Sequence, residues 1–204
     1  MISADDVNHQ ELVRQRWLTL PEQMDRKVEL ISRGMDRSAE ERLLNRARAA
    51  GGKSKRVFWL RQAANVATQS LAEHAACRSG CSHCCNIAVG LSKTEAQQIA
   101  DEIGRPLNKG AGRVVGSAEW QSRAEVDMKF YGVPCTFLVD GKCSIYEFRP
   151  LACRLQLNMD FDDLLCKLVG DEAVKVPYAD FSVHHVVAAS SLDAVHDDIR
   201  NWFA

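Results

Sequence analysis

Long apolar runs and an excess of one charge are both missing from this 204-residue chain. No stretch approaches the roughly 20 apolar residues that span a bilayer, which argues against a transmembrane helix. Residues 1–10 hold two aspartates and no apolar run, so we expect no secretory signal. Lys and Arg number 26 against 27 Asp and Glu, which excludes a nucleic-acid-binding charge spread over the whole molecule. We therefore expect a cytoplasmic protein with no membrane attachment.

Cysteine is too scarce for a small disulfide-stapled scaffold, but it is concentrated locally. Eight cysteines in 204 residues fall below the ~8–10% typical of such scaffolds, and the length allows a core that needs no disulfides. Four of them lie within nine residues, at Cys77, Cys81, Cys84 and Cys85. Thiols stay reduced in the cytoplasm, and thiolates this close repel one another unless a cation compensates them. This block therefore indicates metal ligands.

The adjacent pair Cys84 and Cys85 bears on the number of metals. Adjacent side chains point apart, so we expect this pair to be poorly placed on one ion. Two interpretations stay open, namely two metals or one ligand beside a packed thiol. Four further cysteines follow, at Cys135, Cys143, Cys153 and Cys166. Eight thiols suffice for two tetrahedral zinc sites, or for one iron–sulfur cluster with spare thiols, while Cys135 and Cys166 could also be small core residues.

Local patterns predict a mostly helical chain with one hairpin. Residues 1–76 have a helical pattern throughout, and apolar residues recur at three-to-four spacing in a helix expected to run from Ser54 to about Ser79. Asp140-Gly141 predicts a type I′ turn that places Cys135 and Cys143 near each other at the open end of a hairpin. Other helix signals are capping boxes at Ser92 with Glu95 and at Ser144 with Glu147, a helix from Ser117 to about Tyr131, and a final helix over Leu192–Phe203.

Charge separates the two ends of the chain. Residues 26–61 hold eleven Lys or Arg against four Asp or Glu, and residues 157–204 hold three against nine. Such an asymmetry predicts that the ends pair within a monomer or face one another in an oligomer. A basic arm for nucleic acid is the alternative, but only Phe58 and Trp59 supply aromatic side chains there. A protein partner is therefore favoured.

Basic side chains near the cysteines are candidates for a supporting role. Arg149 and Arg154 could offset thiolate charge and donate hydrogen bonds to sulfur, or they could form surface ion pairs with Glu147. His83 lies inside the first cysteine block, where the abundance of thiols favours an exposed side chain over a ligand. The remaining histidines considered are expected to be surface or core residues: His184, His185 and His196.

These cysteine blocks and their flanking residues resemble a known family. The matching pieces are Cys77–Cys85, Pro134–Leu138, Cys143–Glu147, Arg149-Pro150 and Cys153-Arg154. In this order they resemble the cysteine-cluster family described as a zinc- or iron-chelating domain, which also includes the cysteine-rich part of flagellin lysine N-methylases. The resemblance covers roughly residues 77–166. This chain departs from the family pattern in having three residues between Cys77 and Cys81, where the pattern has two.

The spacing from Cys77 to Cys84 is also the one that radical SAM enzymes use to hold a [4Fe–4S] cluster. Those enzymes place the motif after the first strand of a large α/β barrel. Here a helix is expected before the motif, and 204 residues with few strands do not build that barrel. The sequence therefore does not favour this activity.

The sequence thus predicts an α+β protein, mostly α-helical with a small hairpin, organised around a polycysteine metal site. We expect a basic helical region over residues 1–76, a cysteine-cluster domain over 77–166, and an acidic segment over 167–204 that packs on the core. The expected function is to hold iron or an iron–sulfur cluster, or zinc, in a structural, redox or accessory role. The alternatives are a protein-lysine-modifying enzyme, which the methylase relatives imply, and a metal-stabilised interaction module that docks through the basic helices. The candidate ligands are Cys77, Cys81, Cys84, Cys85, Cys135, Cys143, Cys153 and Cys166.

Overall fold

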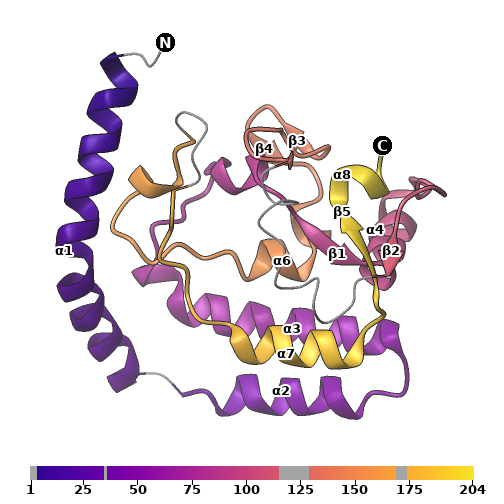
Figure 1. Ribbon diagram of the computed structural model, residues 1–204. Coiled ribbons are helices and arrows are strands. Elements are labelled where there is room, and N and C mark those ends of the chain that lie inside the picture. Colours follow the sequence, from indigo (N-terminus) through magenta and orange to yellow (C-terminus); the bar gives the residue numbers. More distant parts are fainter. Residues whose placement is uncertain (1–3, 35, 115–128, 169–173) are drawn as a thin grey trace.

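The computed structural model describes residues 4–34, 36–114, 129–168 and 174–204 (Figure 1). These parts of the chain are mostly helical and carry two small antiparallel sheets, as the predicted mostly helical α+β class requires. The longer helices are α1 (Ala4–Gly34), α2 (Ser38–Ala49), α3 (Lys53–Leu71), α4 (Lys93–Ile103) and α7 (Ser182–Ser191). The short helices are α6 (Leu151–Arg154) and α8 (Ile199–Trp202), together with the 3-10 turns η1 (Ala72–His74), η2 (His83–Asn86), η3 (Tyr146–Phe148) and η4 (Leu164–Cys166).

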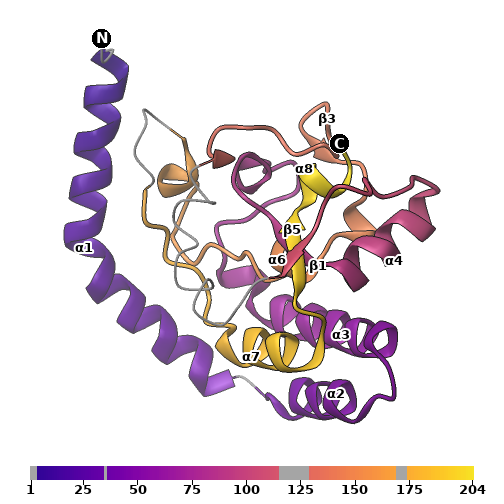
Figure 2. The same cartoon turned by 45° about the vertical axis from the view of Figure 1, so that its right-hand side comes forward.

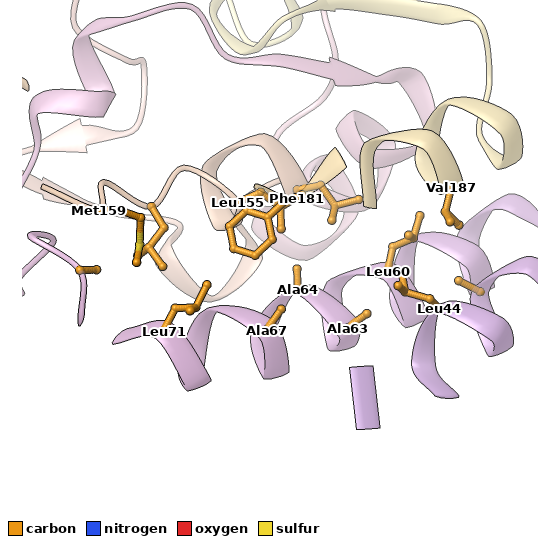
Figure 3. Close-up of a cluster of buried hydrophobic side chains, with 14 residues drawn as sticks. Leu44, Leu60, Ala63, Ala64, Ala67, Leu71, Leu155, Met159, Phe181 and Val187 are labelled. Carbon is orange, nitrogen blue, oxygen red and sulfur yellow. The ribbon is translucent and has the colours of Figure 1, made fainter. Parts of the chain in front are cut away.

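Helices α2, α3 and α7 lie side by side and enclose the first hydrophobic core (Figure 1). Along α3 the predicted apolar face is buried, because Leu60, Ala64 and Leu71 point toward side chains from α7 and from the segment after α6 (Figure 3). The small alanines on this face let the neighbouring backbone approach closely. The helix itself ends at Leu71, earlier than predicted, and η1 follows it.

Helix α1 runs along one side of the molecule, away from the sheet (Figures 1 and 2). Its Leu20 side chain is buried, and Arg16 forms ion pairs with Asp160 at 2.6 Å and with Asp162 at 2.8 Å. Lys27 donates a hydrogen bond to the Met159 carbonyl at 2.7 Å. Arg16 lies outside the basic stretch 26–61, and Lys27 of that stretch reaches the acidic C-terminal part through a backbone carbonyl, so these contacts join the two ends of the chain within one molecule but leave the predicted pairing of the two charged stretches a prediction.

The larger sheet has the strand order β1-β5-β2, with β1 at Gly90–Ser92, β5 at Val195–Asp198 and β2 at Arg113–Val114. Both pairings are antiparallel, with Gly90 opposite Asp198 and Arg113 opposite His196. A second hydrophobic core forms between this sheet and α4, α8 and the hairpin. Its largest buried members are Leu91, Ile99, Phe137, Ile199, Trp202 and Phe203.

The prediction of one final helix over Leu192–Phe203 is wrong. Residues Val195–Asp198 form the central strand of the sheet, and only Ile199–Trp202 are helical. Strand pairing on both sides satisfies the backbone of this segment, so tertiary pairing overrides its helix-like apolar spacing. The Asp198 side chain then caps α8 by accepting a hydrogen bond from the Arg200 backbone N–H.

Two of the other local predictions are confirmed. The Ser92–Glu95 capping box starts α4, with the Ser92 hydroxyl accepting from the Glu95 N–H. The Asp140-Gly141 turn joins β3 (Leu138–Val139) to β4 (Lys142–Cys143), and both turn residues have the positive φ that such a turn requires. Both signals act between residues that are close in the sequence.

The helix start predicted at Ser144 is wrong. The Ser144 hydroxyl donates to the Phe137 carbonyl across the hairpin, and only the short turn η3 follows. The predicted helix from Ser117 falls mainly on residues 115–128, which lie outside the described ranges. None of the described helices is both long and apolar enough to cross a membrane.

Candidate metal centre

All eight cysteines lie in the described parts of the chain and all are free thiols. They come from four places: the segment from Cys77 through η2, the hairpin with the residues before it, α6, and η4. Cys77 packs against the first hydrophobic core, whereas Cys135, Cys143 and Cys153 pack against the second. The structure therefore distributes the thiols between two cores.

Four thiols form one group, which we call the Arg-flanked thiol group: Cys85, Cys135, Cys143 and Cys153. Every pair among these four interacts electrostatically. Burial is the main cause that raises the pKa of Cys135, Cys143 and Cys153, and repulsion from the other thiols of the group adds to it. Cys153 shows the effect most strongly. These three thiols are costly to ionise until a cation is present.

Backbone hydrogen bonds place the Arg-flanked thiol group. The Cys85 carbonyl accepts from the Cys135 N–H at 2.7 Å, which ties η2 to the start of the hairpin. Leu138 pairs with Cys143 across the hairpin, so Cys143 returns toward Cys135. Pro150 precedes the short helix α6, and its carbonyl accepts from the Cys153 N–H at 3.1 Å. Three separate turns thus converge on one place.

Two arginine side chains lie beside the Arg-flanked thiol group. Arg200 is buried against Asp198 and donates to the carbonyls of Cys85 at 3.1 Å and of Val133 at 2.6 Å, so it holds η2 and the segment before the hairpin together. Arg149 lies over the Tyr146 ring at 3.9 Å, and its buried Nε has no hydrogen-bond partner in the structure. A hydrogen bond from Cys84 and the positive charges of Arg200 and Arg149 lower the pKa of Cys85 to about 7. Positive charge is therefore already in place beside this group.

The other four thiols form what we call the cavity-side thiol group: Cys77, Cys81, Cys84 and Cys166. Asn158 joins two of them, because its backbone N–H donates to the Cys77 sulfur at 3.5 Å and its Nδ2 donates to the Cys166 sulfur at 3.2 Å. Burial raises the pKa of Cys166 to about 12, and the neighbouring Cys77 and Cys81 thiols contribute to the shift. Cys81 is exposed, so this group is the more open of the two.

Cys84 and Cys85 do not point apart as expected. Their thiols are hydrogen-bonded to each other within η2, and this contact is the largest cause of the raised pKa of Cys84. Cys84 also interacts with Cys81 of the cavity-side thiol group and with Cys153 of the Arg-flanked thiol group. The tight turn therefore makes the adjacent pair the junction between the two groups.

The remaining candidates from the sequence take structural roles. The Arg154 side chain is buried and donates to Asn65 at 2.7 Å and to the carbonyls of Arg149 and Glu147, so it holds α6 against α3. His83 is hydrogen-bonded to Asp163 at 2.9 Å. His184 is buried in α7, and burial lowers its pKa. These contacts give no reason to assign Arg154, His83 or His184 as a metal ligand.

A metal bound here would be held by sulfur. In the described chain no three His, Cys, Asp or Glu side chains are already gathered as a set that could hold an ion. The donor set nevertheless fits zinc, iron or an iron–sulfur cluster, because it consists of eight free thiols from neighbouring segments, and the buried Arg149 Nε has no hydrogen-bond partner. Coordination would require the sulfurs of a group to move closer together.

Sequence reasoning missed two residues that position the thiols, Arg200 and Asn158. Arg200 lies in the acidic C-terminal stretch and Asn158 lies between two apolar residues, so no local pattern marks either one. Arg200 donates to the Cys85 carbonyl, and Asn158 donates to the Cys166 sulfur. The link between Arg200 and η2 joins segments that are distant in the sequence, so only the folded chain reveals it.

Residues 76–173 match the model of one protein family, CxxCxxCC, described as "Putative zinc- or iron-chelating domain". The matched range contains all eight cysteines, and it confirms the resemblance to the cysteine-cluster family. The match supports metal binding in general. No curated protein and no solved structure matches the chain.

Proposed function

We propose that this protein binds two metal centres, one at the Arg-flanked thiol group and one at the cavity-side thiol group, with cysteine thiolates as the ligands. The observation that carries the proposal is that the eight free thiols interact within two neighbouring groups, and that Cys84 and Cys85 link these groups. Four thiolates are the complete ligand set of a tetrahedral zinc or iron site, and they are also the usual ligand set of an iron–sulfur cluster.

The positive charge of Arg149 and Arg200 beside the Arg-flanked thiol group supports metal ligation by its thiolates. Burial and mutual repulsion make it costly to ionise the thiols. A bound cation would offset this cost, because it attracts the thiolates that bind it. Four thiolates on a divalent ion leave a net negative charge, which the nearby Arg149 and Arg200 would offset. The Arg149 Nε would then have a sulfur as its partner.

The Arg-flanked thiol group suits a structural centre. Its ligands come from turns and from short elements, such as the two-residue strands β3 and β4, which have little regular structure of their own. A metal joining them would contribute its binding free energy to folding. Iron or an iron–sulfur cluster is the cofactor we favour. Zinc is the close alternative, because both metals accept an all-thiolate shell.

Metal analysis of anaerobically purified protein tests the proposal. Two zinc ions per chain, or iron with acid-labile sulfide and absorption near ~400 nm, are the expected results. Cys153→Ser should lose the metal of the Arg-flanked thiol group only, and Cys166→Ser that of the cavity-side thiol group only. Ser79→Ala, an exposed change in the same loop, is the control that should lose neither. Wild-type protein without metal, or equal and complete loss in both cysteine variants, contradicts two separate centres.

A second function, docking of an acidic protein partner, is favoured by the exposed basic residues of α2 and the start of α3. These side chains are Arg42, Arg46, Arg48, Lys53 and Lys55. Binding of such a partner should weaken as salt is raised, because exposed charges are screened. Affinity that stays constant over about a tenfold rise in salt concentration would contradict this role.

A further inference from the structure

A cavity of about 440 Å³ opens beside the cavity-side thiol group. This volume lies within the range of about 300–1,000 Å³ that is usual for small-molecule sites. Its walls come from η2, the start of β1, α6, η4, the segment before α7 and α7 itself. The wall includes His83, Cys84, Ala88, Gln156, Cys166 and Tyr178.

The wall carries no Lys, Arg, Asp or Glu side chain among the described residues. Half of the lining residues are aliphatic, and the polar groups are thiols, imidazoles, phenols and the Gln156 amide. A negatively charged ligand would lose its hydration here without a positive counter-charge on the wall, whereas an uncharged ligand has no charge to desolvate. The cavity therefore favours an uncharged, mostly apolar molecule with a hydrogen-bonding group over an anion of the same shape.

Polar groups are available to orient such a molecule. The His83 ring is held by its hydrogen bond to Asp163 at 2.9 Å, so its position is fixed on the wall. Tyr178 is hydrogen-bonded to Gln156, so two neighbouring polar side chains of the wall hold each other in place. A hydroxyl group on the ligand could donate to one of these groups and accept from another.

The cavity touches one thiol group and not the other. Cys84 and Cys166 lie on its wall, whereas none of the four thiols of the Arg-flanked thiol group does. Structural zinc sites are closed, while sites that act on a substrate keep an accessible side. Access for a small molecule therefore distinguishes the two groups.

We propose that this cavity binds a small, uncharged, mostly apolar hydroxyl compound against the cavity-side thiol group. The placement of the ligand beside a metal rests on the proposed function, but binding in the cavity does not. The cavity-side thiol group would then be the centre that meets a substrate or effector.

Calorimetric titration of the full-length, metal-loaded protein with 2-naphthol tests the proposal. The matched probe is 2-naphthoate, which has the same ring system and a negative charge. We expect 2-naphthol to bind and 2-naphthoate to bind at least about tenfold more weakly. Equal affinity for both, or no binding of 2-naphthol, overturns the proposal.

Substitutions that fill the cavity locate the binding site. Ala88→Trp should weaken 2-naphthol binding at least about tenfold, and Val176→Trp serves in the same way if the first variant does not fold. Ala72→Trp adds the same side chain at an exposed position outside the wall and should leave the affinity unchanged. Unchanged affinity in a folded cavity-filling variant places the probe elsewhere and overturns the proposal.

Metal content measured on the same samples separates the two proposals. Metal-loaded protein that does not bind 2-naphthol refutes the cavity proposal alone. Protein that binds 2-naphthol in the cavity but holds no metal refutes the proposed function alone. In cobalt-loaded protein, 2-naphthol should alter the thiolate-to-cobalt absorption of Cys153→Ser and leave that of Cys166→Ser unchanged. The opposite pattern would refute the placement of the ligand beside the cavity-side thiol group.

Discussion

The two thiol groups share the same donor chemistry but differ in almost everything around it. In the Arg-flanked thiol group every pair of thiols interacts, two arginines lie nearby, and three of the four cysteines pack on the second hydrophobic core. In the cavity-side thiol group Asn158 joins Cys77 to Cys166, Cys81 is exposed, and a cavity reaches two of the thiols. The surroundings of identical side chains therefore decide whether they form a closed site or an accessible one.

The largest expected effect comes from removing Arg200. Arg200→Met leaves Asp198 buried without its ion-pair partner and frees the carbonyls of Cys85 and Val133. We expect a loss of about 3–5 kcal/mol in the free energy of unfolding, together with the metal of the Arg-flanked thiol group. Urea unfolding and metal analysis measure both effects. The exposed Arg48→Met is the control, and a loss under about 1 kcal/mol in Arg200→Met would remove the proposed role of Arg200.

Substitution of Asn158 provides the corresponding test for the cavity-side thiol group. Asn158→Ala removes the side-chain hydrogen bond to the Cys166 sulfur from a buried position. The free energy of unfolding should fall by about 1–3 kcal/mol, and metal should be lost from the cavity-side thiol group while the other group keeps its own. Exposed Asn45→Ala provides the control in the same unfolding and metal measurements. Loss from the Arg-flanked thiol group instead would reverse the assignment.

Removing the Arg149 side chain tests whether arginine offsets the thiolate charge in the Arg-flanked thiol group only. Arg149→Met should weaken metal binding at the Arg-flanked thiol group by about 10–100-fold and leave the cavity-side thiol group unaffected. Competition with a chelator measures each affinity in the Cys153→Ser and Cys166→Ser backgrounds. Arg113→Met changes an exposed arginine outside both groups and should have no effect. Equal weakening at both groups would contradict the distinction drawn from Arg149.

The smallest effect concerns the attachment of α1 to the loop that carries Asn158. The hydrogen bond from Arg16 lowers the pKa of Asp162 below its ordinary value of 3.8. The stabilisation is therefore fully present above the unfolded-state pKa and is lost as the pH falls through the lower, folded-state pKa. Asp162→Asn should cost about 0.2–1 kcal/mol at neutral pH, because the Asp162 side chain is half exposed, and progressively less in acid. Unfolding free energies of the two proteins at neutral pH and in acid below the folded-state pKa check this, and a difference that does not shrink would contradict it.

Local signals in the sequence predict local structure well where no distant partner intervenes. The Ser92–Glu95 capping box and the Asp140-Gly141 turn depend on neighbouring residues, and both form as predicted. The prediction for the final segment fails because its conformation is decided by β1 and β2, which lie far earlier in the chain. The prediction for Ser144 fails for the same reason on a smaller scale, since the Phe137 carbonyl across the hairpin accepts its hydroxyl hydrogen bond.

The sequence by itself determined the donor chemistry and the mostly helical class. Clustered cysteines restrict the candidate ligands to sulfur, and the spacing of apolar residues determines which face of α3 is buried. Only the tertiary structure decided which thiols lie together, that Arg200 and Asn158 position them, and that one group meets a cavity. These relations depend on packing and hydrogen bonds between separate segments of the chain, so they leave no local pattern in the sequence.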